Sequence, residues 1–79
     1  MSVRRGDDGS TVVLDGNCPV EDAEPLLEFL QATPGADLDW RQCCQIHTAV
    51  LQVVLAGRPR LIGPCGDDWI ERYVASKTL

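Results

Sequence analysis

Two cysteines and the single histidine lie close together in the stretch Cys43-Cys44-x-x-His47. Thiolates and neutral imidazoles are side chains that zinc prefers, and Cys18 and Cys65 could complete a set of ligands. The spacing is poor for such a site, because the sequence has no C-x-x-C pair and these two cysteines are distant. Cysteine is also a small hydrophobic residue of many cores. Structural thiols, a metal site and a reactive thiol are therefore three open interpretations.

Thr48 follows the histidine, at or near the start of an apolar helical segment. A phosphate on its hydroxyl would meet free backbone N–H groups and the positive end of the helix dipole. A threonine at this position can equally cap the helix through its side-chain oxygen. His47 and Thr48 do not form a catalytic pair, because neighbours in a helix point in different directions and no orienting acid is indicated. We expect Thr48 to be a cap, a partner contact or a phosphorylation site, and we expect no enzyme activity.

Three aspartates, Asp15, Asp37 and Asp39, lie at the ends of predicted strands. The carboxyl ends of parallel strands often form ligand crevices, but aspartate is also common in the turns that follow strands. The glycine-containing loop at residues 63–66 lacks the spacing and the lysine of a phosphate-binding loop. We therefore expect no bound nucleotide or other cofactor.

The elements that position these residues alternate between strands and helices. Extended segments are predicted from β-branched runs and from period-2 alternation. The four predicted strands are Ser2–Arg5, Thr11–Leu14, Ala36–Trp40 and Arg60–Ile62. The run Asp15-Gly16-Asn17 is expected to end the second of them, because it combines turn-forming residues.

Three further segments have the apolar periodicity of helices. The first is predicted to begin with Asp22 as its cap and to end before Pro34. The last is predicted to begin with a capping box, in which Asp68 is the cap and Glu71 is the third helical residue.

The second predicted helix begins near Ile46 and has a very narrow polar stripe, formed by Gln45, Thr48 and Gln52. Gly57 is expected just beyond its end, where glycine accepts a left-handed conformation. A helix this apolar must be largely covered. We expect it to pack on a sheet and also to meet another helix or a partner protein.

The order of these elements predicts one small α/β domain over residues 1–79, in which residues 1–10 are flexible or form an edge strand. Alternating strands and helices imply a sandwich of a mostly parallel sheet, of about four strands, with three helices. Three helices are too few to cover both faces of such a sheet. An exposed apolar patch or edge is therefore expected, and a partner or a homodimer would cover it.

The formal net charge is −5, with twelve acidic and seven basic residues. Nucleic-acid binding and binding to an anionic membrane are therefore disfavoured, whereas a basic protein partner is favoured. No segment approaches the ~20 apolar residues that span a bilayer, so we expect no membrane insertion. Because residues 1–10 are polar, we expect no signal peptide there, and we expect a cytoplasmic protein with reduced thiols.

One stretch resembles the core signature of STAS domains of the anti-sigma-factor-antagonist type. The strand Asp37-Leu38-Asp39-Trp40 and the run from Ile46 to Leu55 are similar to the family's "v-D-L-s" strand and its "i-D-S-S-G-L-x-x-L" segment. Leu14-Asp15-Gly16, before a leucine-rich helix, also resembles the family's preceding strand and helix. The similarity covers roughly residues 11–75.

Four positions depart from that pattern. His47 stands at the family's aspartate, Thr48 at its phosphorylatable serine, and Ala49 and Val50 at the following serine and glycine. A final strand is also missing. The resemblance implies a small, divergent bacterial member whose partner is a kinase or an anti-sigma-like ATPase, and Thr48 keeps the hydroxyl that phosphorylation needs.

We therefore expect a non-enzymatic protein-interaction module of bacterial signalling. Its predicted docking residues are Asp39, His47, Thr48, Leu51 and Gln52. One alternative is a cytosolic thiol- or metal-sensing protein that uses Cys43, Cys44 and His47, with Cys65 as a further ligand. A second alternative is a structural subunit of a complex.

Overall fold

The computed structural model of the chain describes residues 2–77 and has an α/β architecture. Within this range it contains four strands, a short 3-10 helix and three α-helices. In chain order these elements are β1 (Val3–Arg5), β2 (Thr11–Cys18), η1 (Val20–Asp22), α1 (Ala23–Ala32), β3 (Asp37–Ile46), α2 (Thr48–Gly57), β4 (Arg60–Ile62) and α3 (Asp68–Lys77). Over residues 2–77, no helix has both the length and the apolar character needed to cross a bilayer.

The four strands form one mixed sheet in the order β1-β2-β3-β4. β2 and β3 are parallel, as are β3 and β4, whereas β1 is antiparallel to β2. The prediction of four strands and three helices is confirmed, but the sheet is mixed and not mostly parallel. The reason is the connection between β1 and β2, which is a short turn around Gly9 with φ +74° and not a helical crossover.

The two central strands are longer than the sequence predicted. β2 continues through Asp15-Gly16-Asn17 to Cys18, and β3 continues to Ile46. The register between them shifts between Val13 and Asp15 and again between Gly16 and Asn17. Gly16 has a φ of +75°, which glycine adopts without steric cost, so the chain absorbs these irregularities without leaving the sheet.

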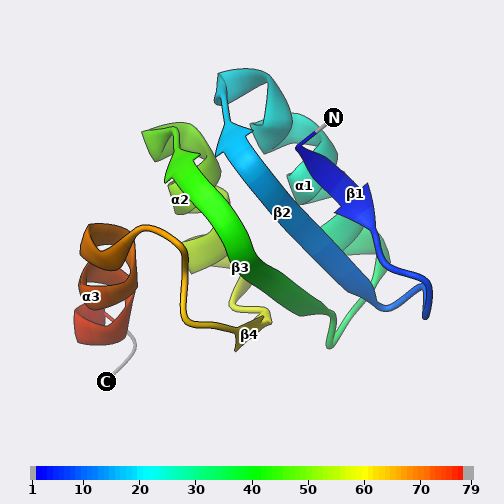
Figure 1. Cartoon of the computed structure of the whole chain (residues 1–79). Coiled ribbons are helices and arrows are strands. Elements are labelled where there is room, and N and C mark those ends of the chain that lie inside the picture. Colours follow the sequence, from blue (N-terminus) through cyan, green and yellow to red (C-terminus); the bar gives the residue numbers. More distant parts are fainter. Residues whose placement is uncertain (1, 78–79) are drawn as a thin grey trace.

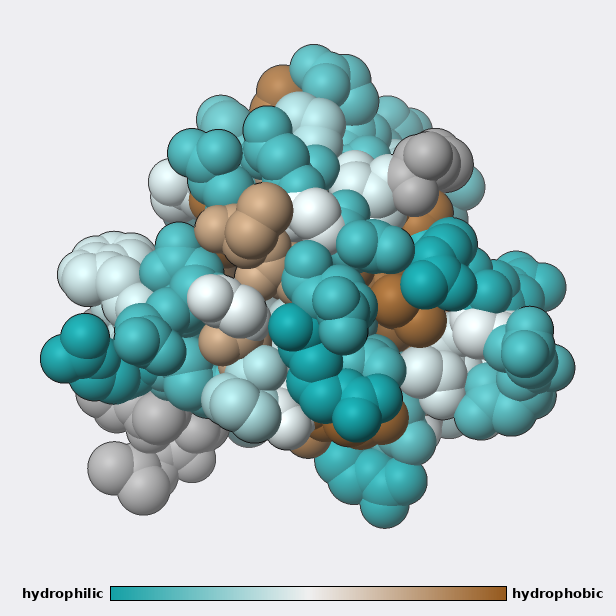
Figure 2. Space-filling model, viewed as in Figure 1, coloured by the Kyte–Doolittle hydropathy of each residue, from teal (hydrophilic) through white to brown (hydrophobic). Residues whose placement is uncertain are grey.

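The helices α1 and α2 lie side by side on one face of the sheet, and α3 lies beyond the edge that β4 forms (Figure 1). The apolar side chains of the strands point towards α1 and α2 and form a single core with Trp40 at 0 % exposure. The opposite face, called the open face below, has no helix over it. An exposed apolar patch or edge was expected, and Figure 2 shows that this face is mostly hydrophilic with scattered apolar spots.

The helix ends differ from the predicted caps. Asp22 makes no capping bond and is buried at 5 % exposure, where it accepts a hydrogen bond from the Ser2 hydroxyl. In α3 the capping side chain belongs to Asp67 and not to Asp68, since Asp67 Oδ1 accepts from the N–H groups of Trp69 and Ile70 at 2.9 and 3.3 Å.

Glu71 does not complete a capping box. Its carboxylate instead accepts the N–H of Cys65 at 2.8 Å and so fixes the loop that leads into α3. The same loop is held against β3, because the N–H of Gly66 donates to the Trp40 carbonyl at 3.4 Å.

The C-terminal end of α2 is also displaced by one residue. Gly57 is the last helical residue, and the left-handed conformation falls on Arg58, with φ and ψ both at 48°. The N–H of Arg58 donates to the Val54 carbonyl at 3.1 Å, which closes the last turn.

Candidate functional site

An open hollow of about 460 Å³ lies at the carboxyl ends of β2 and β3, next to the first turns of η1 and α2. Parallel strands carry ligand and partner sites at this end, because the connections to the following helices gather there. The hollow is lined by Asn17, Cys18, Pro19, Val20, Gln45, Ile46, His47 and Thr48. Two of the predicted docking residues, His47 and Thr48, thus form part of its wall.

His47 is the N-cap of α2, a role that was one of three interpretations for Thr48. The Nδ1 atom of His47 accepts the Ala49 N–H at 3.0 Å, which requires this nitrogen to be unprotonated. The His47 N–H also donates to the Cys18 carbonyl at 2.9 Å and ties the start of α2 to the end of β2. The position of the first turn of α2 therefore depends on the end of β2.

Thr48 is the first helical residue of α2 and its side chain is exposed. Because His47 does the capping, the Thr48 hydroxyl has no hydrogen-bond partner among residues 2–77. Gln52 lies four residues further along the helix, on the same side as Thr48, and is also exposed. These two residues and His47 form one accessible strip.

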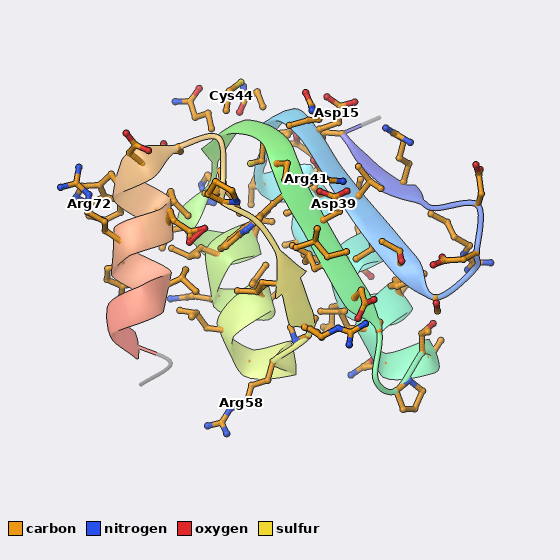
Figure 3. The ribbon with its side chains drawn as sticks, turned by 60° about the horizontal axis from the view of Figure 1, so that its bottom comes forward. Asp15, Asp39, Arg41, Cys44, Arg58 and Arg72 are labelled. Carbon is orange, nitrogen blue, oxygen red and sulfur yellow. The ribbon has the colours of Figure 1, made fainter. Side chains whose placement is uncertain are left out.

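The other two predicted docking residues do not belong to this strip. Leu51 is 6 % exposed and packs in the core, because α2 turns this side of the helix towards the rest of the domain. Leu51 is thus corrected from a docking residue to a core residue. Asp39 lies near the start of β3 on the open face, where Figure 3 shows it next to Arg41 and away from α2.

Three arginine–aspartate pairs neutralise the charge of the open face. Arg41 Nη2 lies 2.8 Å from Asp39 Oδ2, and Arg60 Nη2 lies 2.9 Å from Asp37 Oδ2. A longer pair joins Arg4 to Asp15 at 3.5 Å. Each of the three aspartates that the sequence placed at strand ends, Asp15, Asp37 and Asp39, therefore has an arginine as its partner.

Three cysteines are buried and one is exposed. Cys18 Sγ lies 3.9 Å from Cys43 Sγ, and Cys65 Sγ lies 4.0 Å from the Cys43 carbonyl oxygen. Cys44 is exposed at the carboxyl end of β3 (Figure 3). Because Cys44 and His47 face solvent while Cys43 and Cys65 are buried, these four side chains do not converge. Over residues 2–74, no group of three histidine, cysteine or acidic side chains is placed to hold a metal ion.

The buried thiols differ in acidity. The hydrogen bond between Cys43 and Cys18 raises the pKa of the Cys43 thiol, with burial as a further cause, and the same bond lowers the pKa of Cys18. Burial raises the pKa of Cys65 to about 11. Within this cluster Cys18 is thus the sulfur on which negative charge is most stable.

Sequence reasoning missed Val20. Val20, in the wall of the hollow, is 47 % exposed, and the only signal for it is an apolar residue between Pro19 and the acidic Glu21. The sequence left Trp69 and Tyr73 open as core residues or as interface anchors; Trp69 is 63 % exposed and stacks on Tyr73 with ring centroids 5.4 Å apart.

Comparisons with protein-family models, with curated proteins and with solved structures found no match to this chain.

Proposed function

We propose that this chain is a non-enzymatic protein-interaction module of bacterial signalling, and that its docking surface is centred on the hollow. We define the docking surface as His47, Thr48, Gln52 and Val20 together with the hollow between them. The observation that carries the proposal is the Thr48 side chain, which is exposed at the first position of α2 and has no partner among residues 2–77.

The chemistry of this surface suits a protein partner better than a small substrate. Val20 supplies exposed apolar area, and the neighbouring polar side chains can form hydrogen bonds at its rim. The hollow is open, and its wall contains neither a charged side chain nor a nucleophile paired with a base. With a net charge of −5, the chain favours encounter with a basic partner surface.

Phosphorylation of Thr48 would give this surface a switch. A phosphate would add roughly two negative charges next to the N-terminal turn of α2. The helix dipole favours such a charge, so the modified helix would remain intact while its neutral surface became negatively charged. The phosphate would also replace the hydroxyl hydrogen and fill the space beside it, so a partner that docks closely on the unmodified hydroxyl would be released in spite of the added charge.

A STAS-like relationship is part of the proposal. It is supported by the alternation of strands and helices and by the place of Thr48 directly after β3, at the start of α2. That place corresponds to the serine that the resemblance implies as the phosphorylation site. On this view the partner is a kinase or an anti-sigma-like ATPase.

The test is parallel affinity purification from the lysate of the native host, with identification of the captured proteins by mass spectrometry. The baits are the wild type, Thr48→Glu, Val20→Asp and, as a matched control, Gln31→Glu. Gln31 is exposed on α1 and is not part of the docking surface, so this control adds the same charge elsewhere.

We expect a signalling protein to be retained by the wild type and by Gln31→Glu, and to be lost with the other two baits. Equal retention by all four baits would contradict the docking surface. No retained protein would favour the alternatives, a structural subunit or a thiol-based sensor. Circular dichroism of each bait ensures that a loss of binding is not a loss of folding.

A further inference from the structure

The sulfur atoms of Cys18 and Cys43 lie 3.9 Å apart although they come from different strands. In the register, Cys43 is opposite Gly16 and Cys18 is opposite Ile46, so the two cysteines are diagonal neighbours. The register shift between Gly16 and Asn17 lies directly between these two pairs. Both residues are 0 % exposed and belong to the core.

At this separation the two sulfur atoms are not bonded, but they are close enough to form a disulfide after a small movement. A disulfide needs a sulfur–sulfur distance of about 2.05 Å, so the two atoms must approach each other by about 2 Å. Rotation of the two side chains and a small movement at the strand ends would close that gap. The irregular pairing at this end of β2 and β3 makes such a movement easier than in a regular ladder.

We propose that Cys18 and Cys43 form a reversible disulfide when the protein meets a hydroperoxide, and that this bond reshapes the adjacent hollow. The first half of the proposal stands on the thiol geometry alone. The second half, that a reshaped hollow alters partner binding, rests on the proposed function.

The reaction balances with hydrogen peroxide as the oxidant. The Cys18 thiolate attacks one peroxide oxygen, the O–O bond breaks, and the departing hydroxide takes up a proton to become water. Cys18 is then a sulfenic acid. The Cys43 sulfur attacks the Cys18 sulfur, the S–O bond breaks, and hydroxide leaves with the proton of the Cys43 thiol as a second water. Two thiols are oxidised by two electrons and one peroxide is reduced.

The surroundings assign the two roles. Cys18 lines the hollow, so a small oxidant that enters there approaches Cys18 first, when the covering atoms open locally. The hydrogen bond between Cys43 and Cys18 also lowers the pKa of Cys18, which favours the thiolate that attacks. Cys43 does not line the hollow, and its sulfur lies 3.9 Å from that of Cys18, where it can resolve the sulfenic acid. Hydroperoxides are the suitable class of oxidant because larger disulfides cannot reach a fully buried sulfur.

The backbone would transmit the structural effect of the disulfide to the docking surface. The Cys18 carbonyl accepts the His47 N–H at 2.9 Å, and Pro19 and Val20 follow Cys18 directly. Movement of Cys18 towards Cys43 therefore shifts the hydrogen bond that anchors the start of α2. It also shifts the segment that carries the exposed Val20 side chain.

The experiment oxidises reduced, full-length protein with hydrogen peroxide, blocks free thiols under denaturing conditions, and maps tryptic peptides without reduction. Cleavage after Arg41 separates Cys18 from Cys43, and cleavage after Arg60 separates both from Cys65. Cys44 shares a peptide with Cys43, so the Cys44→Ser variant is mapped in parallel. This substitution affects only an exposed side chain, and the variant is expected to fold as the wild type does.

We expect the peptides of residues 6–41 and 42–60 to be linked within one chain, in the wild type and in Cys44→Ser, and to separate again with dithiothreitol. Cys65→Ala should keep this link, whereas Cys18→Ala and Cys43→Ala should lose it. A link to the Cys65 peptide, a link only between chains, or oxidation without any link would each overturn the proposal. The wild type and Cys44→Ser keep all buried residues unchanged, so these two proteins decide the outcome even if an alanine variant fails to fold.

The effect on the hollow is measured on Cys44→Ser by NMR, without any partner. The amide signals of Val20, His47 and Thr48 should shift between the reduced and oxidised forms, and those of Gln31 should not. Unchanged signals would refute the coupling while leaving the disulfide in place. If the signals shift but affinity purification retains no partner, the proposed function fails and the redox pair stands.

Discussion

Asp39 and Arg41 lie two residues apart on β3, and their side chains meet on the open face through two hydrogen bonds. Arg41 donates from Nε to Asp39 Oδ1 at 3.0 Å and from Nη2 to Oδ2 at 2.8 Å. The backbone N–H of Arg41 also donates to Oδ1, at 3.1 Å. All three of these hydrogen bonds to Asp39 come from Arg41 of the same strand, so the Asp39 carboxylate is held on the open face and away from the surface around Thr48.

The first prediction concerns acid stability. The Arg41 side chain holds the pKa of Asp39 below its ordinary value of 3.8. A carboxylate whose pKa is lower in the folded chain stabilises the fold above its unfolded pKa, and this contribution disappears as the pH falls through the folded pKa. We expect Asp39→Asn to be less stable than the wild type at neutral pH, and the difference to shrink below about pH 3.8. Urea unfolding at several pH values measures it.

The control for Asp39 is Glu28→Gln, which removes an exposed carboxylate from α1, outside the open face. A difference between Asp39→Asn and the wild type that stayed constant over the whole pH range would contradict the role of ionisation.

The second prediction concerns the cap of α2. His47→Ala removes the side-chain acceptor of the Ala49 N–H and should lower the free energy of unfolding by about 1 kcal/mol. His47→Asn supplies an oxygen that is a good N-cap acceptor and should retain most of the stability. Chemical denaturation of both variants distinguishes them. Equal losses would show that the capping bond contributes little.

The third prediction is a gain of stability at the end of α2. Arg58 is exposed and holds a left-handed conformation, which costs a non-glycine residue about 1–2 kcal/mol. Glycine avoids this cost but loses more chain entropy on folding, so Arg58→Gly should stabilise the fold by about 0.5–1 kcal/mol. Arg58→Ala keeps the strain and should give no gain. A thermal melt of the three proteins checks the order.

The fourth prediction concerns the loop before α3. A methyl group at Gly66 would overlap the backbone carbonyl of Cys43, and backbone atoms cannot rotate away as a side chain can. Gly66→Ala should therefore cost about 1–3 kcal/mol.

Gly9→Ala is the matched control for Gly66→Ala. Gly9 has a φ of +74° but no atom within 4 Å of the added methyl, so it tests backbone strain without a clash. We expect a smaller loss than at Gly66. Unfolding curves in urea measure both, and an equal loss would remove the argument from close packing.

Sequence patterns predicted the order of the elements because apolar periodicity reflects which side of each element is buried. They failed at Asp15-Gly16-Asn17, where turn-forming residues stay inside β2. Local propensity favours a turn there, but pairing with β3 provides hydrogen bonds that a turn would lose. Bulges of this kind depend on the partner strand and leave no distinct signal in one sequence.

The candidate site was predicted in part. The exposure of Thr48 and Gln52 followed from the narrow polar stripe of α2, whereas Leu51 was assigned to the surface because the apolar face was read as wider than the sheet could cover. The capping role of His47 could not be predicted, because histidine is not among the preferred N-caps. The contact between Cys18 and Cys43 depends on the register and its shifts, which sequence spacing does not contain.

The sheet ends on both sides in strands of three residues, β1 and β4. An exposed edge strand is a template on which another chain can add a strand, and long edges promote aggregation. Strands this short offer few free backbone groups in a row, and they carry the long charged side chains of Arg4, Arg5 and Arg60. The domain can therefore leave a hydrophilic sheet face open to water and still resist growing into fibrils through its edges.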